Sequence, residues 1–381
     1  MTPRQFPHAM LPRTRHDERA RQDFVRTYKI HVLSGLGPGN RAVYDRKVKP
    51  ALDRQGGAKS GRNIAPAMAR EPFWQAWSSL NRTGQELMWE ALSEPAFREL
   101  PRLLDAAKTL KARRTGGSLT LDPQQPVPRY IAAVDIHGQP GGYGLEMLPG
   151  DVYAGALYDL SAFHYSLGGL GPHGADPGDS TVAFLRRRYP GFTPRRILDL
   201  GCSVGASTLP LADAWPDAEV HAIDMSPAML RYADARARDL GRAVHFHQQN
   251  AEATSFPDGH FDLIVSQLFF HETSATAVRA IMKECRRLLA SGGLMLHMDV
   301  PEANRFWPDA YDRWWRDWTT HFNAEPYRSK MRDTDLGTEA VSAGFARSKV
   351  FETKIPSARA EGTYKSTHGY GAEWHVVVAE D

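Results

Sequence analysis

The sequence predicts an α/β protein in which a mainly helical first half precedes a mostly parallel β-sheet. In the first half, apolar residues recur at three- to four-residue spacing, which is typical of amphipathic helices. After about residue 181, apolar strands alternate with amphipathic helices, a pattern typical of a parallel sheet covered on both faces. A glycine-rich linker near residue 180 separates two predicted domains, 1–180 and 181–381.

The composition excludes several classes of protein. Hydrophobic residues make up 42% and charged residues 24% of the 381 residues, which excludes a disordered or fibrous chain. No apolar run approaches the ~20 residues of a spanning helix, and the first residues lack the apolar segment of a secretory signal. We therefore expect a cytoplasmic protein that makes no membrane contact.

Metal and disulfide sites are not expected. The two cysteines, Cys202 and Cys285, are too few for a disulfide framework or a four-ligand zinc site. No closely spaced His, Asp or Glu pair repeats at metal-ligand intervals. We predict that the protein binds no metal.

Positive charge is concentrated in residues 1–60, which hold thirteen Lys and Arg against five Asp and Glu. Such a segment can dock on nucleic acid or form a solvated helix face. The basic residues are dispersed among acidic ones and lack the interleaved aromatic residues of a single-strand platform. We favour the solvated face and expect no nucleic-acid partner.

The first half is predicted to be helical over about 16–112. Trp74, Trp77, Leu80, Met88 and Leu92 recur at helical spacing within one segment. Next, 129–137 and 143–148 read as two short strands around the turn GQPGG, and 151–166 is an aromatic segment. The second half supplies seven predicted strands, at 196–201, 219–224, 243–248, 261–267, 292–300, 347–355 and 373–380, of which the last two form an antiparallel pair.

A tight turn joins the first of these strands to the following helix. The strand ILDL runs into GCSVGAS, which places Asp199, Gly201, Ser203 and Gly205 in the turn. Small residues let a ligand approach the backbone, and free N–H groups at the helix start favour an anion such as a carboxylate. The dinucleotide pattern GxGxxG needs glycine where Ser203 stands, and no phosphate-binding lysine follows. A phosphate cradle is therefore not predicted.

Two further strand ends carry residues suited to a nucleoside. Asp224 ends the second strand, at the distance where a carboxylate accepts both ribose hydroxyls. Asn250 and Ala251 follow the third strand, where an amide and a backbone N–H can read an adenine edge.

Together these features resemble the class I S-adenosylmethionine-dependent methyltransferases, particularly their small-molecule branch, over about 181–381. The resemblance implies a Rossmann-like sheet of seven strands with a reversed final hairpin and S-adenosylmethionine as cofactor. By likeness, Asp199 to Gly205 hold the methionine part and Asp224 the ribose. Met225 covers the adenine face, Asn250 and Ala251 read its edge, and Gln267 completes the cofactor site. Ser203 and Asn250 depart from the commoner Gly and Asp.

His271 and Glu272 follow the fourth strand. In similar O-methyltransferases a His-Asp pair at this place removes the acceptor proton, which makes His271 the candidate base with Glu272 in the acidic position. The ordinary pKa of histidine, ~6.5, suits that task. The alternative, which has equal weight, is that His271 only lines the pocket or caps the next helix.

Other candidates lie on either side of the cofactor domain. Tyr158 and Tyr165, with His164 ranked below them, resemble residues of an entry helix that covers the cofactor; simple packing between domains is the alternative. Asp299 ends the fifth strand at the same crevice. Trp314 and Trp318 share a helical face that forms either buried packing or a wall of the acceptor pocket. His137 is either a pocket residue or, as we favour, a structural histidine.

We conclude that the sequence predicts an enzyme that transfers a methyl group from S-adenosylmethionine to a small-molecule acceptor. Oxygen is the first choice of acceptor atom, with nitrogen or sulfur as the alternative. The helical domain is expected to cover the acceptor pocket and to support a homodimer. An RNA methyltransferase using the basic segment and a cofactor-binding module without catalysis are the other hypotheses.

Overall fold

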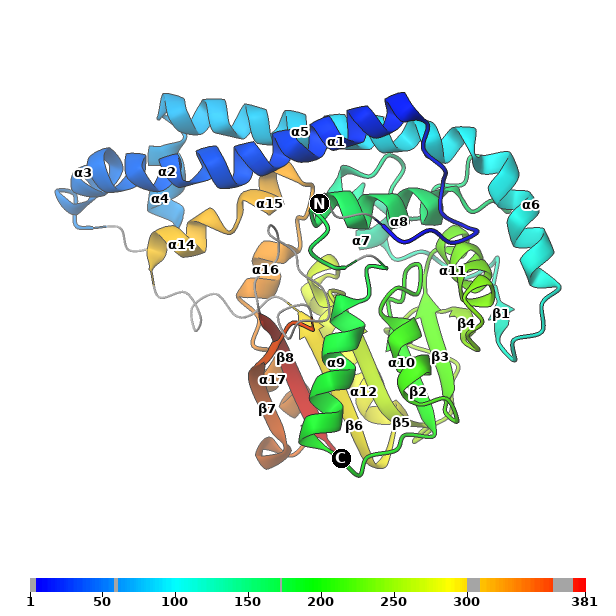
Figure 1. Ribbon diagram of the computed structural model, residues 1–381. Coiled ribbons are helices and arrows are strands. Elements are labelled where there is room, and N and C mark those ends of the chain that lie inside the picture. The colour runs from blue at the N-terminus through cyan, green and yellow to red at the C-terminus, as the bar shows by residue number, and fades with distance from the viewer. Residues whose placement is uncertain (1–4, 58–60, 172, 300–308, 359–372) are drawn as a thin grey trace.

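A layer of helices lies over one edge of an α/β sandwich in the computed structural model, which describes residues 5–57, 61–171, 173–299, 309–358 and 373–381 (Figure 1). The layer begins with a continuous helical run from residue 16 to residue 53, in which two π-helical stretches interrupt the α-helix. Its elements are α1 (His16–Ile30), η1 (His31–Leu36), α2 (Gly37–Val43), η2 (Tyr44–Val48), α3 (Lys49–Asp53), α4 (Gly61–Met68), α5 (Pro72–Arg98) and α6 (Leu100–Lys111).

In the described residues, eight strands form one sheet in the order β1-β4-β3-β2-β5-β6-β8-β7. All neighbours pair in parallel except that β8 is antiparallel to both β6 and β7. The strands are β1 (Ser118–Thr120), β2 (Arg196–Leu200), β3 (Glu219–Asp224), β4 (His245–Gln248), β5 (Phe261–Gln267), β6 (Leu289–Asp299), β7 (Val350–Pro356) and β8 (Glu373–Glu380). The predicted sheet and its reversed hairpin are confirmed, except that the sheet has eight strands instead of seven. The extra strand, β1, has three residues, too few to show a periodic pattern.

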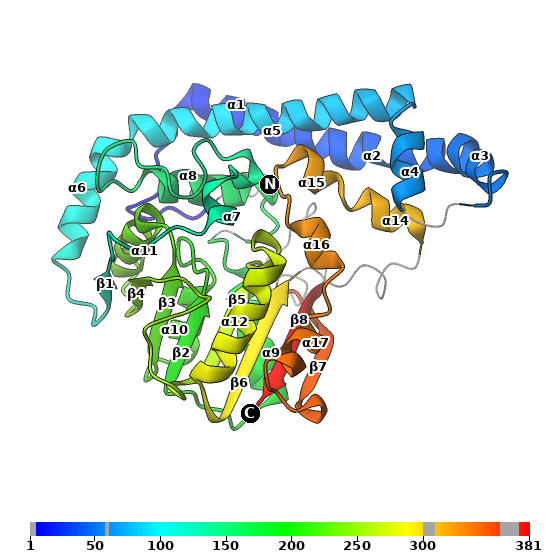
Figure 2. The same ribbon diagram turned by 180° about the vertical axis from the view of Figure 1, so that it is seen from behind.

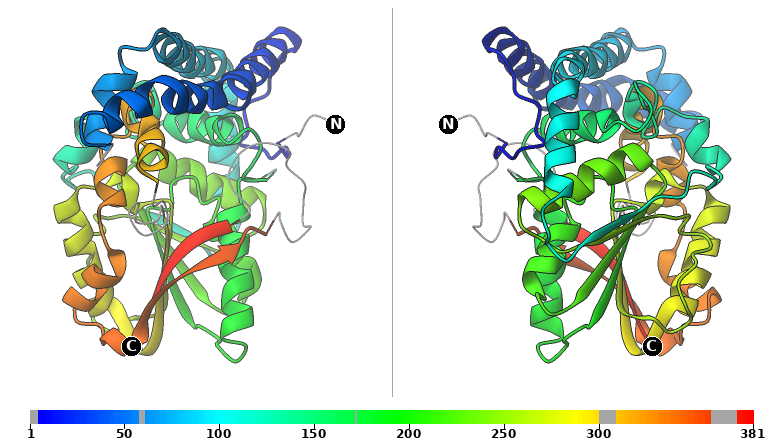
Figure 3. Two further views of the ribbon diagram at one scale, coloured as in Figure 1. Left: turned by 90° about the vertical axis from the view of Figure 1, so that its left-hand side faces the viewer. Right: turned by 90° about the vertical axis from the view of Figure 1, so that its right-hand side faces the viewer.

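Helices cover both faces of the sheet, and the side views show the sheet between them (Figure 3). Successive strand residues point to opposite faces. Ile197 therefore joins a core with α9 (Asp176–Arg188), α10 (Thr208–Ala214) and α11 (Pro227–Asp239). Leu198 joins the other core, with α12 (Ala275–Leu288) and α17 (Leu336–Ser342). Burial on both faces explains why these strands read as nearly continuous apolar runs.

Two segments connect the helical layer to the sandwich. One is α8 (Tyr153–Tyr165), which shares a buried cluster with α5, α6 and α11. The other follows β6 and contains α14 (Ala310–Trp315), α15 (Trp318–Phe322) and α16 (Arg328–Arg332). There α14 contacts α4, and α15 contacts α5, so this segment rises from the sheet to the helical layer (Figure 2). Both segments lie above the edge at which the parallel strands end.

The two short strands predicted within 129–148 are wrong. The structure has α7 (Arg129–Ala132) and the 3-10 turn η3 (Ile136–Gly138) there, with no strand partner. Glycines 138, 141 and 142 all have positive φ, so the chain turns repeatedly instead of extending. The loop predicted between the last two strands lies mostly outside the described residues.

Several basic residues of the first helices form ion pairs at the surface. Arg21 pairs with Glu94, Lys47 with Glu71 at 3.3 Å, and Lys49 with Asp53 at 2.8 Å. This surface therefore carries both signs of charge. Within the described ranges, no helix has the length and hydropathy needed to cross a membrane.

We predict that Gly155→Ala destabilises the protein, because an added Cβ on α8 would lie 2.4 Å from Cβ of the fully buried Tyr232 on α11. Overpacking of this kind costs about 1–3 kcal/mol in the free energy of unfolding. Denaturant titration checks the loss. Gly191→Ala is the matched control, since nothing lies within 4 Å of its added Cβ; equal stability of both variants would contradict the prediction.

Candidate functional site

Two cavities lie side by side at the edge where the parallel strands end. The first, about 590 Å³, is lined by the β2–α10 turn and the ends of β3, β4 and β5, and we call it the turn cavity. The second, about 540 Å³, is lined by His137, His271 and His375, and we call it the histidine cavity. Tyr143, Tyr158, Leu268 and Glu272 line both cavities. A molecule in one cavity therefore lies next to a molecule in the other.

The β2–α10 turn brings backbone to the wall of the turn cavity. Gly201, Ser203 and Gly205 have φ values of 68°, 50° and 73°, the left-handed region that glycine adopts without strain. A Cβ on Gly201 would lie 2.3 Å from the Phe269 ring. Gly201 and Ser203 line the cavity, whereas Gly205 lies behind the turn against Phe246.

Asp224 lines the turn cavity at the end of β3, where backbone donors fix its carboxylate. The N–H groups of Ser203 and Ser226 donate to its two oxygens, each at 2.9 Å. Burial raises the pKa of Asp224, and these donors oppose that rise. Each carboxylate oxygen can still accept one more hydrogen bond. The group can therefore hold a ligand with two neighbouring hydroxyls.

Asp199 supports the turn from behind instead of lining the cavity. Its Oδ2 accepts a hydrogen bond from the Thr208 hydroxyl at 2.5 Å, and its Oδ1 is buried without a partner among the described residues. Burial raises the pKa of this carboxyl to about 7. The structure thus places Asp199 and Gly205 next to the cavity, but not in its lining.

The other predicted cofactor residues from β3, β4 and β5 all line the turn cavity: Met225, Asn250, Ala251 and Gln267. Asn250 closes a turn, because its Oδ1 accepts the Glu252 N–H at 2.9 Å. The Gln267 side-chain nitrogen is buried without a hydrogen-bond partner among the described residues. It is a donor that a bound molecule can satisfy.

His271 lines the histidine cavity, where a carboxylate holds its imidazole. Its Nδ1 lies 2.8 Å from Asp299 Oδ1. The other oxygen of Asp299 accepts the Phe270 N–H at 2.7 Å. Glu272, expected to be the acidic partner, has its Oε1 3.8 Å from Nε2 and forms no hydrogen bond to the ring. The acidic partner is Asp299, because β6 ends beside β5 and points its last side chain at the residue that follows β5.

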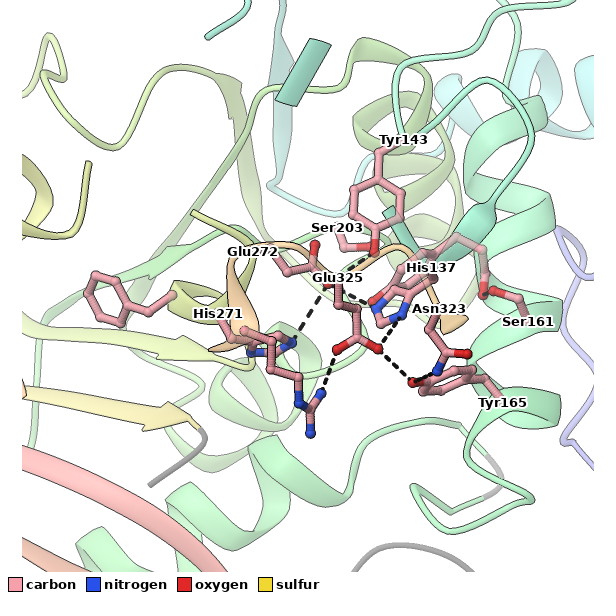
Figure 4. A network of polar contacts seen from close by, with 12 residues as sticks. His137, Tyr143, Ser161, Tyr165, Ser203, His271, Glu272, Asn323 and Glu325 are labelled. Atoms are coloured by element: carbon pink, nitrogen blue, oxygen red, sulfur yellow. Dashed lines mark hydrogen bonds and ion pairs between the residues drawn. The ribbon is translucent and has the colours of Figure 1, made fainter. Parts of the chain in front are cut away.

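His137 is the centre of a network between two carboxylates (Figure 4). Its ring nitrogens lie 3.0 Å from Glu272 and 3.2 Å from Glu325. The Tyr143 hydroxyl donates to Glu272 at 3.0 Å, and the Tyr165 hydroxyl donates to Glu325 at 2.9 Å. Burial lowers the pKa of His137, but the two carboxylates outweigh burial and raise it to about 10. His137 is therefore a protonated residue of the cavity wall.

Three residues of this site were not predicted from the sequence: Tyr143, Asn323 and Glu325. Glu325 is buried and also pairs with Arg328 at 2.8 Å, and Asn323 donates to the Tyr165 hydroxyl at 2.8 Å. Glu325 and Asn323 follow α15, a few residues after the tryptophan candidates. Their contacts with Tyr165 on α8 and His137 on η3 are not visible in the local sequence.

The candidate residues of the entry helix, which is α8 in the structure, lie in different places. Tyr158 lines both cavities, whereas Tyr165 lines only the histidine cavity. His164 lines neither and bonds to the Leu160 carbonyl.

The tryptophan candidates are corrected by the structure: neither Trp314 nor Trp318 lines either cavity. Trp314 packs 4.6 Å from the Trp74 ring, and Trp318 lies edge-on to Trp77 at 6.2 Å. The apolar face they share points at the helical layer, so it serves packing.

Among the described residues, no group of three or more His, Cys, Asp or Glu side chains is arranged to hold a metal ion. Both cysteines are free and buried. In the histidine cavity, His137 and His271 are instead paired with carboxylates.

Comparison with known proteins places residues 197–293 in a methyltransferase domain family. Demethylmenaquinone methyltransferase of Thermus thermophilus is 35% identical over 108 residues, 28% of this chain and 48% of that protein. Malonyl-[acyl-carrier protein] O-methyltransferase of Geobacter sulfurreducens is 40% identical over 107 residues, 27% of this chain and 38% of that protein. The chain thus spans less than half the length of these curated relatives. A solved structure of phosphoethanolamine N-methyltransferase 2 from Haemonchus contortus, 17% identical, aligns with a TM-score of 0.41 over 58% of this chain and 56% of that one.

We predict that His137 makes the stability of the protein depend on pH. Its pKa of about 10 lies above the ~6.5 of an unfolded histidine. The ion pairs therefore contribute fully below pH ~6.5 and are lost as the pH rises toward 10. The free energy of unfolding should fall over this window by about 2–4 kcal/mol more than in His137→Asn. Asparagine tolerates the positive φ of 59° at this position.

Denaturant titrations at pH 6, 8 and 10 measure this difference. The control is His16→Asn, because the His16 side chain is 96% exposed and its loss should not change the pH profile. Parallel profiles for the wild type and His137→Asn would contradict the prediction.

Proposed function

We propose that this chain, whose residues 197–293 form a methyltransferase domain of the class I S-adenosylmethionine-dependent kind, methylates a small-molecule acceptor on oxygen. The observation that carries the proposal is the pair of adjoining cavities. The turn cavity offers groups for a nucleoside with an amino-acid tail, and the histidine cavity offers an oriented base.

The residues of the turn cavity fit S-adenosylmethionine. The fixed carboxylate of Asp224 would accept the two ribose hydroxyls, as its free lone pairs allow. Met225 and Ala251 would contact the adenine, and the unsatisfied amide of Gln267 would donate to the ligand. The backbone of Gly201 and Ser203 would face the amino-acid tail. A pyrophosphate ligand does not suit a cavity that presents the carboxylates of Asp224 and Glu272.

The position of Asp299 determines how His271 can act. A carboxylate only accepts, so the 2.8 Å contact places the imidazole proton on Nδ1 and leaves Nε2 as the basic nitrogen. Nε2 would take the proton of an acceptor hydroxyl, and Asp299 and Glu272 would then stabilise the imidazolium. Bound S-adenosylmethionine supplies a methyl group whose bond to the sulfonium breaks as the acceptor oxygen bonds to carbon, leaving the electron pair on sulfur.

Much of the rate of such a displacement comes from aligning the acceptor with the methyl carbon and from excluding water. Tyr143 and Tyr158 lie between the cavities with their rings 5.5 Å apart. They would restrict the acceptor to the line between His271 and the methyl carbon. An amine or thiolate acceptor needs no strong base, so the His271–Asp299 pair favours oxygen.

The first test is calorimetry with S-adenosylmethionine and its demethylated product, followed by incubation with labelled donor and a cell extract of small molecules. Mass spectrometry should show one compound heavier by a CH₂ group. A protein that binds neither cofactor form would contradict the proposal.

Asp224→Asn should raise the dissociation constant of S-adenosylmethionine by about tenfold, because a buried hydrogen bond to a charged acceptor is worth ~1.5–3 kcal/mol. Calorimetry measures the change. The matched control is Asp213→Asn, an exposed carboxylate paired with Arg242, which should bind as the wild type does. Unchanged affinity in Asp224→Asn would remove this residue from the cofactor site.

His271→Gln should lower turnover by about 10²–10⁴-fold, the usual contribution of a general base. Affinity for the demethylated cofactor should stay within about twofold, since His271 lines only the histidine cavity. Initial rates with the unmethylated precursor of the compound identified above, together with calorimetry, separate the two effects. Normal turnover would show that His271 only lines the pocket.

A further inference from the structure

Glu272 stands where the two cavities adjoin. The residues that line both cavities are Tyr143, Tyr158, Leu268 and Glu272. Burial, followed by the charge of Glu272, raises the pKa of Tyr143 well above its ordinary value, so this phenol stays neutral. Leucine and an ordinary tyrosine likewise bring no charge at pH 7. Glu272 is therefore the charged member of this group.

Every other charged side chain in the walls of the two cavities lines only one of them. In the turn cavity, Asp224 is held by backbone donors, and Glu146 pairs with Arg231. In the histidine cavity, carboxylates, imidazoles, guanidiniums and a lysine are all present, so both signs of charge occur there. What distinguishes Glu272 is its place, not the sum of the charges around it.

One carboxylate oxygen of Glu272 is occupied by the cavity wall, and the other is open. Oε1 lies 3.0 Å from His137 Nε2 and accepts the Tyr143 hydroxyl at 3.0 Å (Figure 4). Oε2 forms no hydrogen bond with the described residues. The side chain is 18% exposed, so a ligand can reach it. His137 offsets part of the charge of Glu272 and fixes its direction, and a bound cation can contact Oε2 without displacing a protein donor.

The proposed reaction brings a positive charge to the same junction. The base lies in the histidine cavity and the nucleoside in the turn cavity, so the methyl group must cross between them. The residues that line both cavities are therefore next to the sulfonium that carries it. As the acceptor oxygen bonds to the methyl carbon, the C–S bond breaks with its electron pair on sulfur, and the acceptor proton passes to Nε2 of His271. The positive charge thus ends on an imidazole whose Nε2 lies 3.8 Å from Glu272 Oε1.

We infer that Glu272 is the counter-ion of the sulfonium, and that it makes the cofactor site prefer the charged donor to its neutral, demethylated product. The inference rests on the proposed function and assigns a role within it. A carboxylate that met only the sulfonium would stabilise the bound donor and slow the transfer. Because the imidazolium of His271 forms beside the same carboxylate, Glu272 keeps a cationic neighbour through the step. Once His271 has lost its proton, the thioether has no charge to hold it, which favours release of the product.

Binding of three ligands to the full chain tests this preference. They are S-adenosylmethionine, its neutral demethylated product, and sinefungin, in which a carbon that bears an ammonium group replaces the methylated sulfur. Calorimetry at pH 7 gives the three dissociation constants. Glu272→Gln should raise the constants of the two cations by about five- to tenfold and change that of the neutral product by less than about twofold, because glutamine keeps the shape of the side chain and removes its charge.

Glu325→Gln is the matched control. Glu325 is the other carboxylate that pairs with His137, at 3.2 Å, but it lines neither cavity. This variant should change the dissociation constants of the cationic and neutral ligands by the same factor. An equal loss of preference in Glu325→Gln and Glu272→Gln would show that the effect passes through His137, and it overturns the inference.

His137→Asn should change the preference in the opposite direction. It removes the cation beside Glu272, so the two cationic ligands should bind about threefold or more tightly relative to the neutral product. This variant also keeps the test valid if Glu272→Gln fails to fold, since an unchanged preference in His137→Asn then overturns the inference.

The outcomes separate the role of Glu272 from the proposed function. A wild-type protein that binds none of the three ligands overturns the function, and the inference with it. A wild-type protein that binds them, with the same ratio of cationic to neutral affinity in folded Glu272→Gln, overturns only the role of Glu272.

Discussion

Every part of the candidate site depends on the common direction of the central strands. β2, β3, β4, β5 and β6 run parallel, so their carboxyl ends meet at one edge of the sheet. β3 and β4 extend the sheet on one side of β2, and β5 and β6 extend it on the other. The loops after β2 and β5 therefore diverge and leave a crevice, as open α/β sheets do where the strand order reverses. The turn cavity occupies this crevice, and the end of β6 brings the histidine cavity beside it.

The two cavities are joined electrostatically through Glu272. Its side chain lines both, and His137 and Tyr143 bind the same oxygen. Buried charges are costly unless they are paired, and here the protonated His137 offsets the two carboxylates of Glu272 and Glu325. The negative charge of Glu272 is therefore kept between the cavities, where a sulfonium would lie next to the acceptor.

Sequence periodicity located most of the strand-end residues, because each one follows a buried apolar run whose end is visible in the sequence. Asp224, Gln267 and Asp299 were placed in this way. The pattern could not show that Asp299, instead of Glu272, partners His271, since that contact depends on the pairing of β5 with β6. It also could not show which neighbour the shared face of Trp314 and Trp318 would meet. Glu325 could not be placed in the site from the sequence, because its contacts with Tyr165 and His137 join segments more than 100 residues apart, although its pair with Arg328 is local.

The two cavities share four lining residues but obtain the rest of their walls mostly from different parts of the chain. The turn cavity is built from the ends of β2 to β5, whose backbones are fixed by the sheet, and from residues of the segment 121–158. The arginines of the histidine cavity come from short helices between β6 and α17, which contact the helical layer through α4 and α5. A substitution in those helices can therefore alter the charge presented to the histidine cavity without moving a strand end.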